Sequence, residues 1–317
     1  MHVLIYGAGA VGQAVGCMLA ADGHTVDMIL RKRFADVIRE HGLTVSGIFG
    51  EYRTEPAAIG TFTTLADCSN RRYDAVFITT KSYDTQTAAN DISSLSYAPP
   101  VIVSLQNGCG NLELLVECFG PNRILGGRVI TGFEIERPGH VRITVTADAV
   151  HIGDSGEGVM SPLAERIASA VDHAGLPCTA TDSIRRDLFA KLLYNCALNP
   201  LGAVLGVHYG ALGENPFSRG IMDAVIDEVF AVISAMGAAT HWKTADEYRE
   251  FFYSSQVPAT YNHRPSMLQD IESGKRTEVD SLTGYVVREG LRLGVATPVC
   301  ETLSNLIRFR EGTGGIK

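Results

Sequence analysis

Three polar side chains recur at every fourth position in the segment KLLYNCALNP, residues 191–200. Lys191, Asn195 and Asn199 would form one slowly drifting line on an α-helix, while leucines cover its other faces. Burying an ammonium or an amide without a partner costs free energy, so such a line needs internal partners or a ligand. The line could be either a polar seam between packed helices or a ligand site, and the spacing alone does not decide between them. Pro200 is expected to break or kink the helix.

A glycine-rich loop near the N-terminus has the spacing of a dinucleotide-binding site. It follows a strand pattern at 2–6 and opens a helical pattern at 11–22. In this context the first glycine makes the tight turn, the second lets backbone approach a pyrophosphate, and the third lets helix pack on strand. The helix N-terminus then offers N–H groups to the anion. A glycine-rich turn that binds nothing is the alternative. The loop comprises Gly7, Ala8, Gly9, Ala10, Val11 and Gly12.

The end of the second strand pattern, 25–30, bears on the choice between NAD and NADP. NAD enzymes usually place a carboxylate there for the ribose 2′-hydroxyl. Asp27 precedes the strand end by several residues and is expected inside the sheet rather than at its rim. Arg31 stands at the rim, where a guanidinium can hold a 2′-phosphate. The sequence therefore predicts NADP(H), with a solvated basic loop as the alternative.

Two more polar residues follow strand patterns at the edge where open α/β sheets bind ligands. Lys81 comes after the strand FITT, and Asn107 opens an Asn-Gly pair after the strand VIVSLQ. A lysine after a strand is usually a surface charge, and Asn-Gly is a common turn. Each residue alone therefore leaves both interpretations open.

An alternation of strands and helices in the first half of the chain must position these residues. Buried-strand patterns recur at 75–80, 101–106 and 123–130, with a helical segment at 84–95. Such alternation predicts an α/β Rossmann-like domain, in which helices cover both faces of a parallel sheet. Residues 128–152 lack a helical pattern, so we expect them to add antiparallel strands to this sheet.

The second half of the chain is helical in period and in capping signals from about Asp182 onward. We therefore expect two domains, with the boundary near residues 177–181. Residues 1–180 would form the dinucleotide-binding Rossmann-like domain. Residues 181–317 would form an all-α domain that binds substrate and carries the catalytic residue.

Composition excludes several function classes. The 317 residues carry a formal net charge of −8, which disfavours nucleic acid and anionic membranes as partners. No apolar run approaches the ~18 residues of a membrane span, so no segment is expected to cross a bilayer, and the N-terminus lacks a signal-peptide pattern. Seven cysteines without C-x-x-C indicate reduced thiols and a cytoplasmic location. No histidine or cysteine cluster indicates a metal site.

The chain resembles the ketopantoate reductases (2-dehydropantoate 2-reductases) over nearly its whole length. Five segments occur in the family's order: the glycine loop, ITTK, LQNGCG, the K-x-x-x-N-x-x-x-N-P helix, and SMLQDIESGKRTEVDSLTG. The resemblance implies a Rossmann-like domain and a helical domain with the active site in the cleft between them. It also implies NADPH-dependent reduction of 2-dehydropantoate to pantoate, in the route to pantothenate and coenzyme A.

The resemblance also implies roles for individual residues. Lys191 is similar to the family's catalytic lysine, and one departure is His263, where some members have asparagine. Hydride addition to a 2-oxo carbon builds negative charge on oxygen, which an ammonium can stabilise and protonate. The implied substrate-binding residues are Asn195, Asn199, Ser266 and Asn107, and the implied cofactor-binding residues beyond the glycine loop are Arg31, Lys81, Asn107 and Glu278.

Two alternatives stay open beside this function. One is a reductase of the same build acting on another small 2-oxo acid, which the residue at 263 would allow. The other is a dinucleotide-binding sensor without turnover. Lys191 beside Asn195 and Asn199 argues against the sensor, which would not need a proton donor. The sequence leaves the oligomeric state open, a homodimer included.

Overall fold

The central sheet begins with a strand that is buried along nearly its whole length. In β1 (His2–Tyr6), Val3, Leu4 and Ile5 are fully buried. Strands covered on both faces need such unbroken apolar runs rather than alternation. β1 pairs in parallel with β2 (Thr25–Ile29) on one side and β6 (Ala75–Ile78) on the other.

The computed structural model describes residues 1–97, 100–156, 158 and 160–312. Two compact units divide the chain. The first comprises Met1–Asn107 and Asn111–Arg185, and the second comprises Gly108–Gly110 and Arg186–Lys317.

The first unit contains an eight-stranded sheet in the order β12-β11-β8-β7-β6-β1-β2-β5. All neighbouring strands run parallel except β11 and β8, which are antiparallel. The expected parallel Rossmann-like sheet with an added antiparallel strand is therefore present. The further strands are β5 (Gly60–Phe62), β7 (Val101–Ser104), β8 (Ile124–Arg128), β11 (Val150–Asp154) and β12 (Cys178–Thr181).

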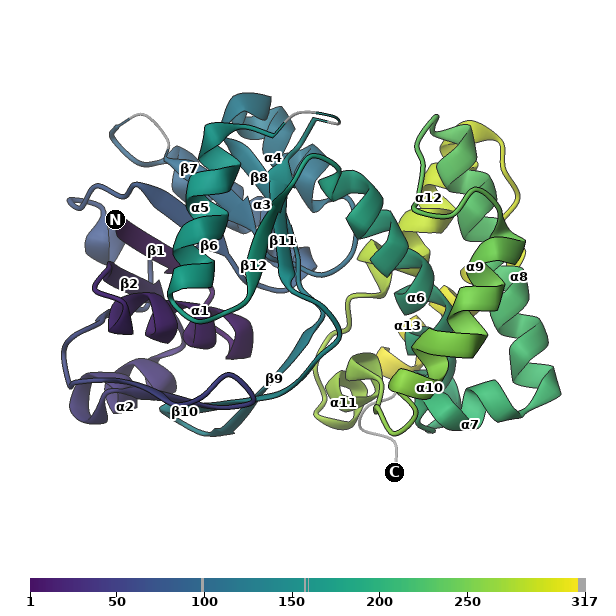
Figure 1. Cartoon of the computed structure of the whole chain (residues 1–317), viewed down its shortest axis with the longest axis horizontal. Coiled ribbons are helices and arrows are strands. Elements are labelled where there is room, and N and C mark those ends of the chain that lie inside the picture. Colours follow the sequence, from purple (N-terminus) through teal and green to yellow (C-terminus); the bar gives the residue numbers. More distant parts are fainter. Residues whose placement is uncertain (98–99, 157, 159, 313–317) are drawn as a thin grey trace. The chain divides into compact units, whose positions relative to one another are not determined.

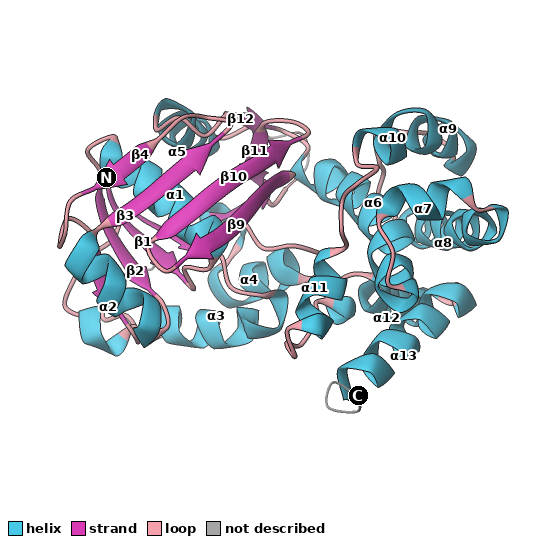
Figure 2. Ribbon diagram, turned by 90° about the horizontal axis from the view of Figure 1, so that it is seen from below, coloured by secondary structure: helices cyan, strands magenta, loops and turns pink. Residues whose placement is uncertain are grey.

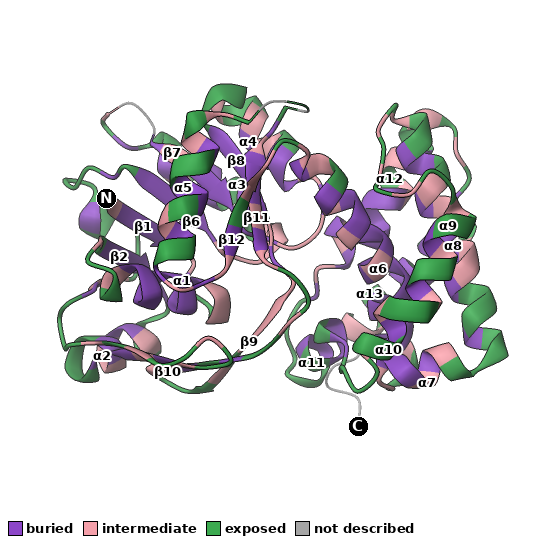
Figure 3. Ribbon diagram, in the orientation of Figure 1, coloured by how far each residue is buried: buried purple, intermediate pink, exposed green. Residues whose placement is uncertain are grey.

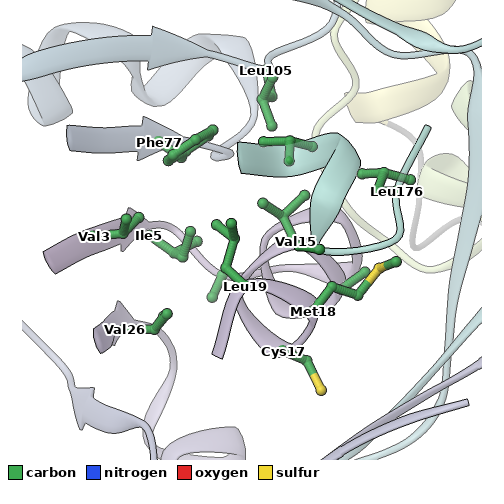
Figure 4. Close-up of a cluster of buried hydrophobic side chains, with 14 of the residues drawn as sticks. Val3, Ile5, Val15, Cys17, Met18, Leu19, Val26, Phe77, Leu105 and Leu176 are labelled. Carbon is green, nitrogen blue, oxygen red and sulfur yellow. The ribbon is translucent and has the colours of Figure 1, made fainter. Parts of the chain in front are cut away.

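Helices cover both faces of this sheet (Figure 1). α1 (Ala10–Ala21) and α5 (Pro162–His173) contact each other, and α3 (Thr85–Ser93) contacts α4 (Asn111–Phe119). α2 (Lys32–His41) packs on the edge strand β5. Figure 4 shows the core between α1 and the sheet, which includes Val3, Ile5, Val15, Leu19 and Phe77.

The antiparallel hairpin expected in the central sheet lies elsewhere. β9 (Thr131–Arg137) and β10 (His140–Thr146) join β3 (Leu43–Gly47) and β4 (Tyr52–Thr54) in a separate sheet, ordered β4-β3-β10-β9, that packs on α1 (Figure 2). The reason is the alternation in β10: Val141 and Ile143 are buried and Arg142 is exposed. Such a strand needs cover on one face only.

The second unit is helical, and no strand follows β12 among the residues described up to 312. The helix α6 (Ile184–Leu205) supplies much of its core, and Figure 3 shows its middle turns as buried. The other helices are α7 (Tyr209–Glu214), α8 (Pro216–Ala235), α9 (Ala245–Phe251), a π-helix (Phe252–Gln256), α10 (Val257–Ala259), α11 (Ser266–Glu272), the 3₁₀ turn η5 (Val279–Ser281), α12 (Thr283–Leu293) and α13 (Pro298–Gly312).

Two expectations about α6 need correction. Pro200 does not break the helix, which continues to Leu205. A proline inside a helix loses the bond to the carbonyl four residues earlier and crowds that carbonyl, but the remaining backbone bonds carry the helix past it. By length and composition α6 could also cross a membrane, although polar residues interrupt its apolar run. Because 72% of that apolar stretch is buried inside the protein, α6 serves as a core helix.

Candidate active site

The three glycines of the N-terminal loop sit in three different steric situations. Gly7 has a φ of +84°, and a Cβ there would lie 2.0 Å from Thr80 Cγ2. A Cβ on Gly12 would lie 2.3 Å from Thr79 Oγ1, so α1 packs closely on the loop after β6. At Gly9 the nearest such atom is 4.0 Å away. The first and third glycines therefore serve the fold, and the second leaves space over the backbone.

The start of α1 fits an anion. Gly9 is the N-cap residue and provides no side-chain hydrogen bond to the first turn. The loop is anchored to the end of β2, because the N–H groups of Gly7 and Ala8 both donate to the Ile29 carbonyl, at 3.1 and 2.8 Å. An exposed glycine at an uncapped helix N-terminus can accommodate the pyrophosphate of a dinucleotide. The loop residues present thus fit a dinucleotide cofactor.

Asp27 lies inside the sheet, as expected, and its carboxylate already has three partners. His2 Nε2 lies 3.0 Å from Oδ2, the Tyr73 hydroxyl donates to the same oxygen at 2.9 Å, and Arg71 donates to Oδ1 at 2.7 Å. The side chain is only 1% exposed. Arg31, by contrast, is the exposed residue between β2 and α2. Of the two, Arg31 is the residue placed at the rim.

Lys81 and Asn107 stand in neighbouring loops, which hydrogen bonds join. Each follows the carboxyl end of its strand, β6 or β7. Ser82, next to Lys81, donates to the Asn107 carbonyl at 2.5 Å, and Asn111 Nδ2 donates to the same carbonyl at 3.1 Å. Gln106 Nε2 adds a bond to Thr85 Oγ1 at 2.8 Å. The structure thus brings these two predicted residues to one edge of the sheet.

The short segment after Asn107 packs within the second unit, against η5. Cys109 N–H donates to the Ser281 carbonyl at 2.9 Å, and a Cβ on Gly108 would lie 2.5 Å from that oxygen. Glu278 is the N-cap residue of η5, and the Ser281 hydroxyl donates to its carbonyl at 3.0 Å. Within the second unit, Gly108–Gly110 and the TEVDS segment are therefore neighbours, although they lie about 170 residues apart in the chain.

The polar line of α6 is present and mostly buried. Lys191 is half-buried, whereas Asn195 and Asn199 are 7% and 3% exposed. Asn199 Nδ2 donates to Ser266 Oγ at 3.0 Å, and its Oδ1 accepts from the Met267 N–H at 3.1 Å. Asn199 and Ser266 are therefore in direct contact. Asn199 at least has hydrogen-bond partners inside the protein, one of the two possibilities that the spacing of the polar line left open.

Both halves of the chain match models of one protein family. The family model described as "Ketopantoate reductase PanE/ApbA" matches residues 3–157, and its C-terminal counterpart matches residues 183–311. The chain belongs to the ketopantoate reductase family.

Relatives of this ketopantoate reductase family match the chain end to end. The 2-dehydropantoate 2-reductase of Aquifex aeolicus is 37% identical over 311 residues, 98% of this chain and 97% of that protein. The enzyme of the same name from Archaeoglobus fulgidus is 33% identical over 312 residues, 98% of each.

Solved structures show the same fold. A PanE/ApbA family ketopantoate reductase from Ralstonia eutropha JMP134 superposes with a TM-score of 0.86 at 30% identity, covering 99% of each chain. A D-mandelate dehydrogenase in complex with NADH and anilino(oxo)acetate also gives a TM-score of 0.86, at 27% identity over 100% of each chain. That structure therefore shows the same fold holding NADH and anilino(oxo)acetate.

Sequence reasoning missed a polar pair between a buried residue of the same helix and an exposed histidine. Asp187, in the first turn of α6, is 2% exposed and lies 2.7 Å from His241 Nε2. Asp187 precedes Lys191 by four residues, so the spacing that marked Lys191, Asn195 and Asn199 extends one turn further back. That continuation was a usable signal, whereas nothing in the sequence indicated His241 as its partner.

Proposed function

We propose that this chain reduces 2-dehydropantoate to pantoate with NADPH as hydride donor, in the route to pantothenate and coenzyme A. Membership of the ketopantoate reductase family, over both halves of the chain, is the observation that carries the proposal. Two curated relatives named 2-dehydropantoate 2-reductase, at 37% and 33% identity over almost the full length, support it further.

NADPH, when bound, supplies the hydride, and residues of the chain bind and orient the cofactor. Gly9 and the N–H groups at the start of α1 would bind the pyrophosphate, and Arg31 the 2′-phosphate. Lys81, Asn107 and Glu278 would complete the cofactor site. Its contact residues in the loop are Gly7, Ala8, Gly9, Ala10, Val11 and Gly12.

Lys191 would act as the general acid. As the 2-oxo carbon gains hydride, its oxygen acquires negative charge, and the Lys191 ammonium stabilises that charge and delivers the proton. Asn107, Asn195, Asn199 and Ser266 would hold the substrate carboxylate and hydroxyl in the orientation that the transfer requires. Asn199 contributes at least by holding Ser266.

We also propose the wider setting of this enzyme. Residues 1–180 would form the dinucleotide-binding domain and residues 181–317 the helical domain that binds substrate and carries Lys191. The substrate is a small molecule and the location cytoplasmic. Neither nucleic acid nor membrane is a partner in this proposal.

A steady-state assay of the purified protein tests the proposed function. NADPH oxidation is followed with 2-dehydropantoate, pyruvate, 2-oxoisovalerate and benzoylformate, and then repeated with NADH. We expect the highest kcat/KM with 2-dehydropantoate and NADPH. Benzoylformate is included because the D-mandelate dehydrogenase shares the fold. A higher kcat/KM with benzoylformate would assign another substrate class, and no turnover with any of the four acids would refute the proposed function.

A further inference from the structure

Asp187 extends the polar line of α6 by one turn toward the helix N-terminus. Its side chain is 3% exposed, and its Oδ1 lies 2.7 Å from His241 Nε2. His241 comes from the connection between α8 and α9, is itself 44% exposed, and meets the Trp242 ring edge-on at 6.0 Å. A surface histidine therefore reaches inward to hold a buried carboxylate in one orientation.

Asp187 and Lys191 share one face of α6. Residues four apart on a helix have Cβ atoms roughly 5–6 Å apart, and an acid placed N-terminal to a lysine is the favourable order. The neighbouring Arg186 is exposed, so it lies on another face. The helix dipole favours an anion in the first turn, and the His241 hydrogen bond compensates part of the cost of burying it.

We propose that Asp187, oriented by His241, is a positioning residue that keeps Lys191 charged and aimed for proton donation. Only the proton donation by Lys191 rests on the proposed function; the effect of Asp187 on the charge of Lys191 does not. An opposite charge within about 4–6 Å favours the ammonium form of a lysine. Removing the charge of Asp187 would make Lys191 lose its proton at lower pH, without removing any substrate contact.

A purely structural role is the competing explanation, since the pair also ties α6 to the α8–α9 connection. The two explanations differ in one measurable property. A structural tie affects the free energy of unfolding and leaves the titration of Lys191 unchanged. A positioning role moves that titration, because it acts through the charge that Lys191 experiences.

The test measures Lys191 directly. Wild type, Asp187→Asn, His241→Phe and His241→Gln are labelled with trace acetic anhydride between pH 7 and 11, and the peptide containing Lys191 is quantified by mass spectrometry. We expect the midpoint to fall by about one pH unit or more in Asp187→Asn, the usual size of a nearby-charge effect. His241→Phe should move it in the same direction, whereas His241→Gln, which retains an N–H donor, should stay near wild type.

Asp246→Asn is the matched control, since Asp246 is a first-turn acid of α9 that pairs with Arg249 in the same unit. It should leave the midpoint unchanged. In Asp187→Asn the alkaline limb of kcat/KM should move to lower pH together with the labelling midpoint, while KM changes little.

An unchanged labelling midpoint in folded Asp187→Asn overturns the inference. If that variant fails to fold, an unchanged midpoint in His241→Phe overturns it instead. Because labelling needs no substrate, a wild-type protein inactive on 2-dehydropantoate refutes the proposed function and leaves this measurement valid.

Discussion

Asn199 holds Ser266 through a hydrogen bond of 3.0 Å from its Nδ2 to the serine oxygen. The same carboxamide accepts the Met267 N–H at 3.1 Å, so one buried side chain fixes the start of α11 to α6. Because the Ser266 oxygen accepts this bond, its own proton is directed away from Asn199. Asn199 thereby orients an exposed hydroxyl that we propose binds substrate.

Asn199→Ala should destabilise the protein by about 1–3 kcal/mol, because it leaves the Met267 N–H buried without its partner. Urea unfolding measures this loss. Ser266→Ala keeps the bond to Met267 but removes the acceptor of Asn199 Nδ2, so it should cost about 1 kcal/mol, the net value of one hydrogen bond, while raising KM. Equal stability of Asn199→Ala and wild type would show that this anchor contributes nothing.

Lys191→Ala should lower kcat by about 10²–10⁴-fold, the usual contribution of a positioned acid. NADPH binding, followed by nucleotide fluorescence, should stay close to wild type, because Lys191 is assigned to the substrate. Lys243→Ala, which removes an exposed lysine of the same unit, serves as the control. Near-normal turnover in Lys191→Ala would refute the assignment.

The glycine loop offers a matched pair of substitutions. Gly12→Ala places a methyl group 2.3 Å from Thr79 Oγ1 and should destabilise the fold by roughly 1–3 kcal/mol, as overpacking does. Gly9→Ala meets no atom within 4 Å other than the Gly7 carbonyl at that limit. It should therefore fold normally yet weaken NADPH binding about tenfold or more, since the methyl group obstructs the pyrophosphate.

Thermal unfolding and a nucleotide titration separate these two effects. Normal NADPH affinity in Gly9→Ala would remove the loop from the cofactor site, whatever the outcome for Gly12→Ala.

Arg31→Ala should weaken NADPH binding by about 10–100-fold, the value of one charge-assisted hydrogen bond, and leave NADH binding unchanged. Isothermal titration with both nucleotides measures the difference. Arg53→Ala, an exposed arginine on β4 that pairs with Glu51, is the control. If wild type binds NADH as tightly as NADPH, the role given to Arg31 is wrong.

Local features of the fold were predictable because their causes are local. The roles of Gly7 and Gly12 follow from a strand that turns directly into a helix, and the structure gives each the close contact that excludes a side chain. Asp27 was expected inside the sheet because it precedes the strand end. Its buried position agrees with that expectation.

Contacts between distant segments were not predictable. β3 pairs with β10 in parallel across about a hundred residues, so no local pattern linked Val45 to Val141. Asp187 and His241 are 54 residues apart, and His241 lies in a loop without periodicity. The spacing of the α6 line indicated that Asn199 needed a partner. It did not indicate that the Met267 backbone would be that partner.

Buried thiols give the protein a dependence on alkaline pH. Burial raises the pKa of Cys17 to about 12 and that of Cys178 also to about 12. In the unfolded chain a thiol ionises near 8.5. A group whose pKa is higher in the folded state contributes stability below its unfolded pKa, and this stability is lost as pH rises toward the folded value.

The free energy of unfolding should therefore decline between about pH 8.5 and 12, because the unfolded state releases thiol protons that the native state retains. Guanidinium unfolding at pH 7.5, 9 and 10.5, in the presence of reductant, measures the decline. Cys178→Ala should make it shallower, whereas Cys118→Ser, at the exposed cysteine, should leave the slope unchanged. A free energy that stays constant or rises over this range would contradict the assignment of protonated thiols to Cys17 and Cys178, which lie in one core.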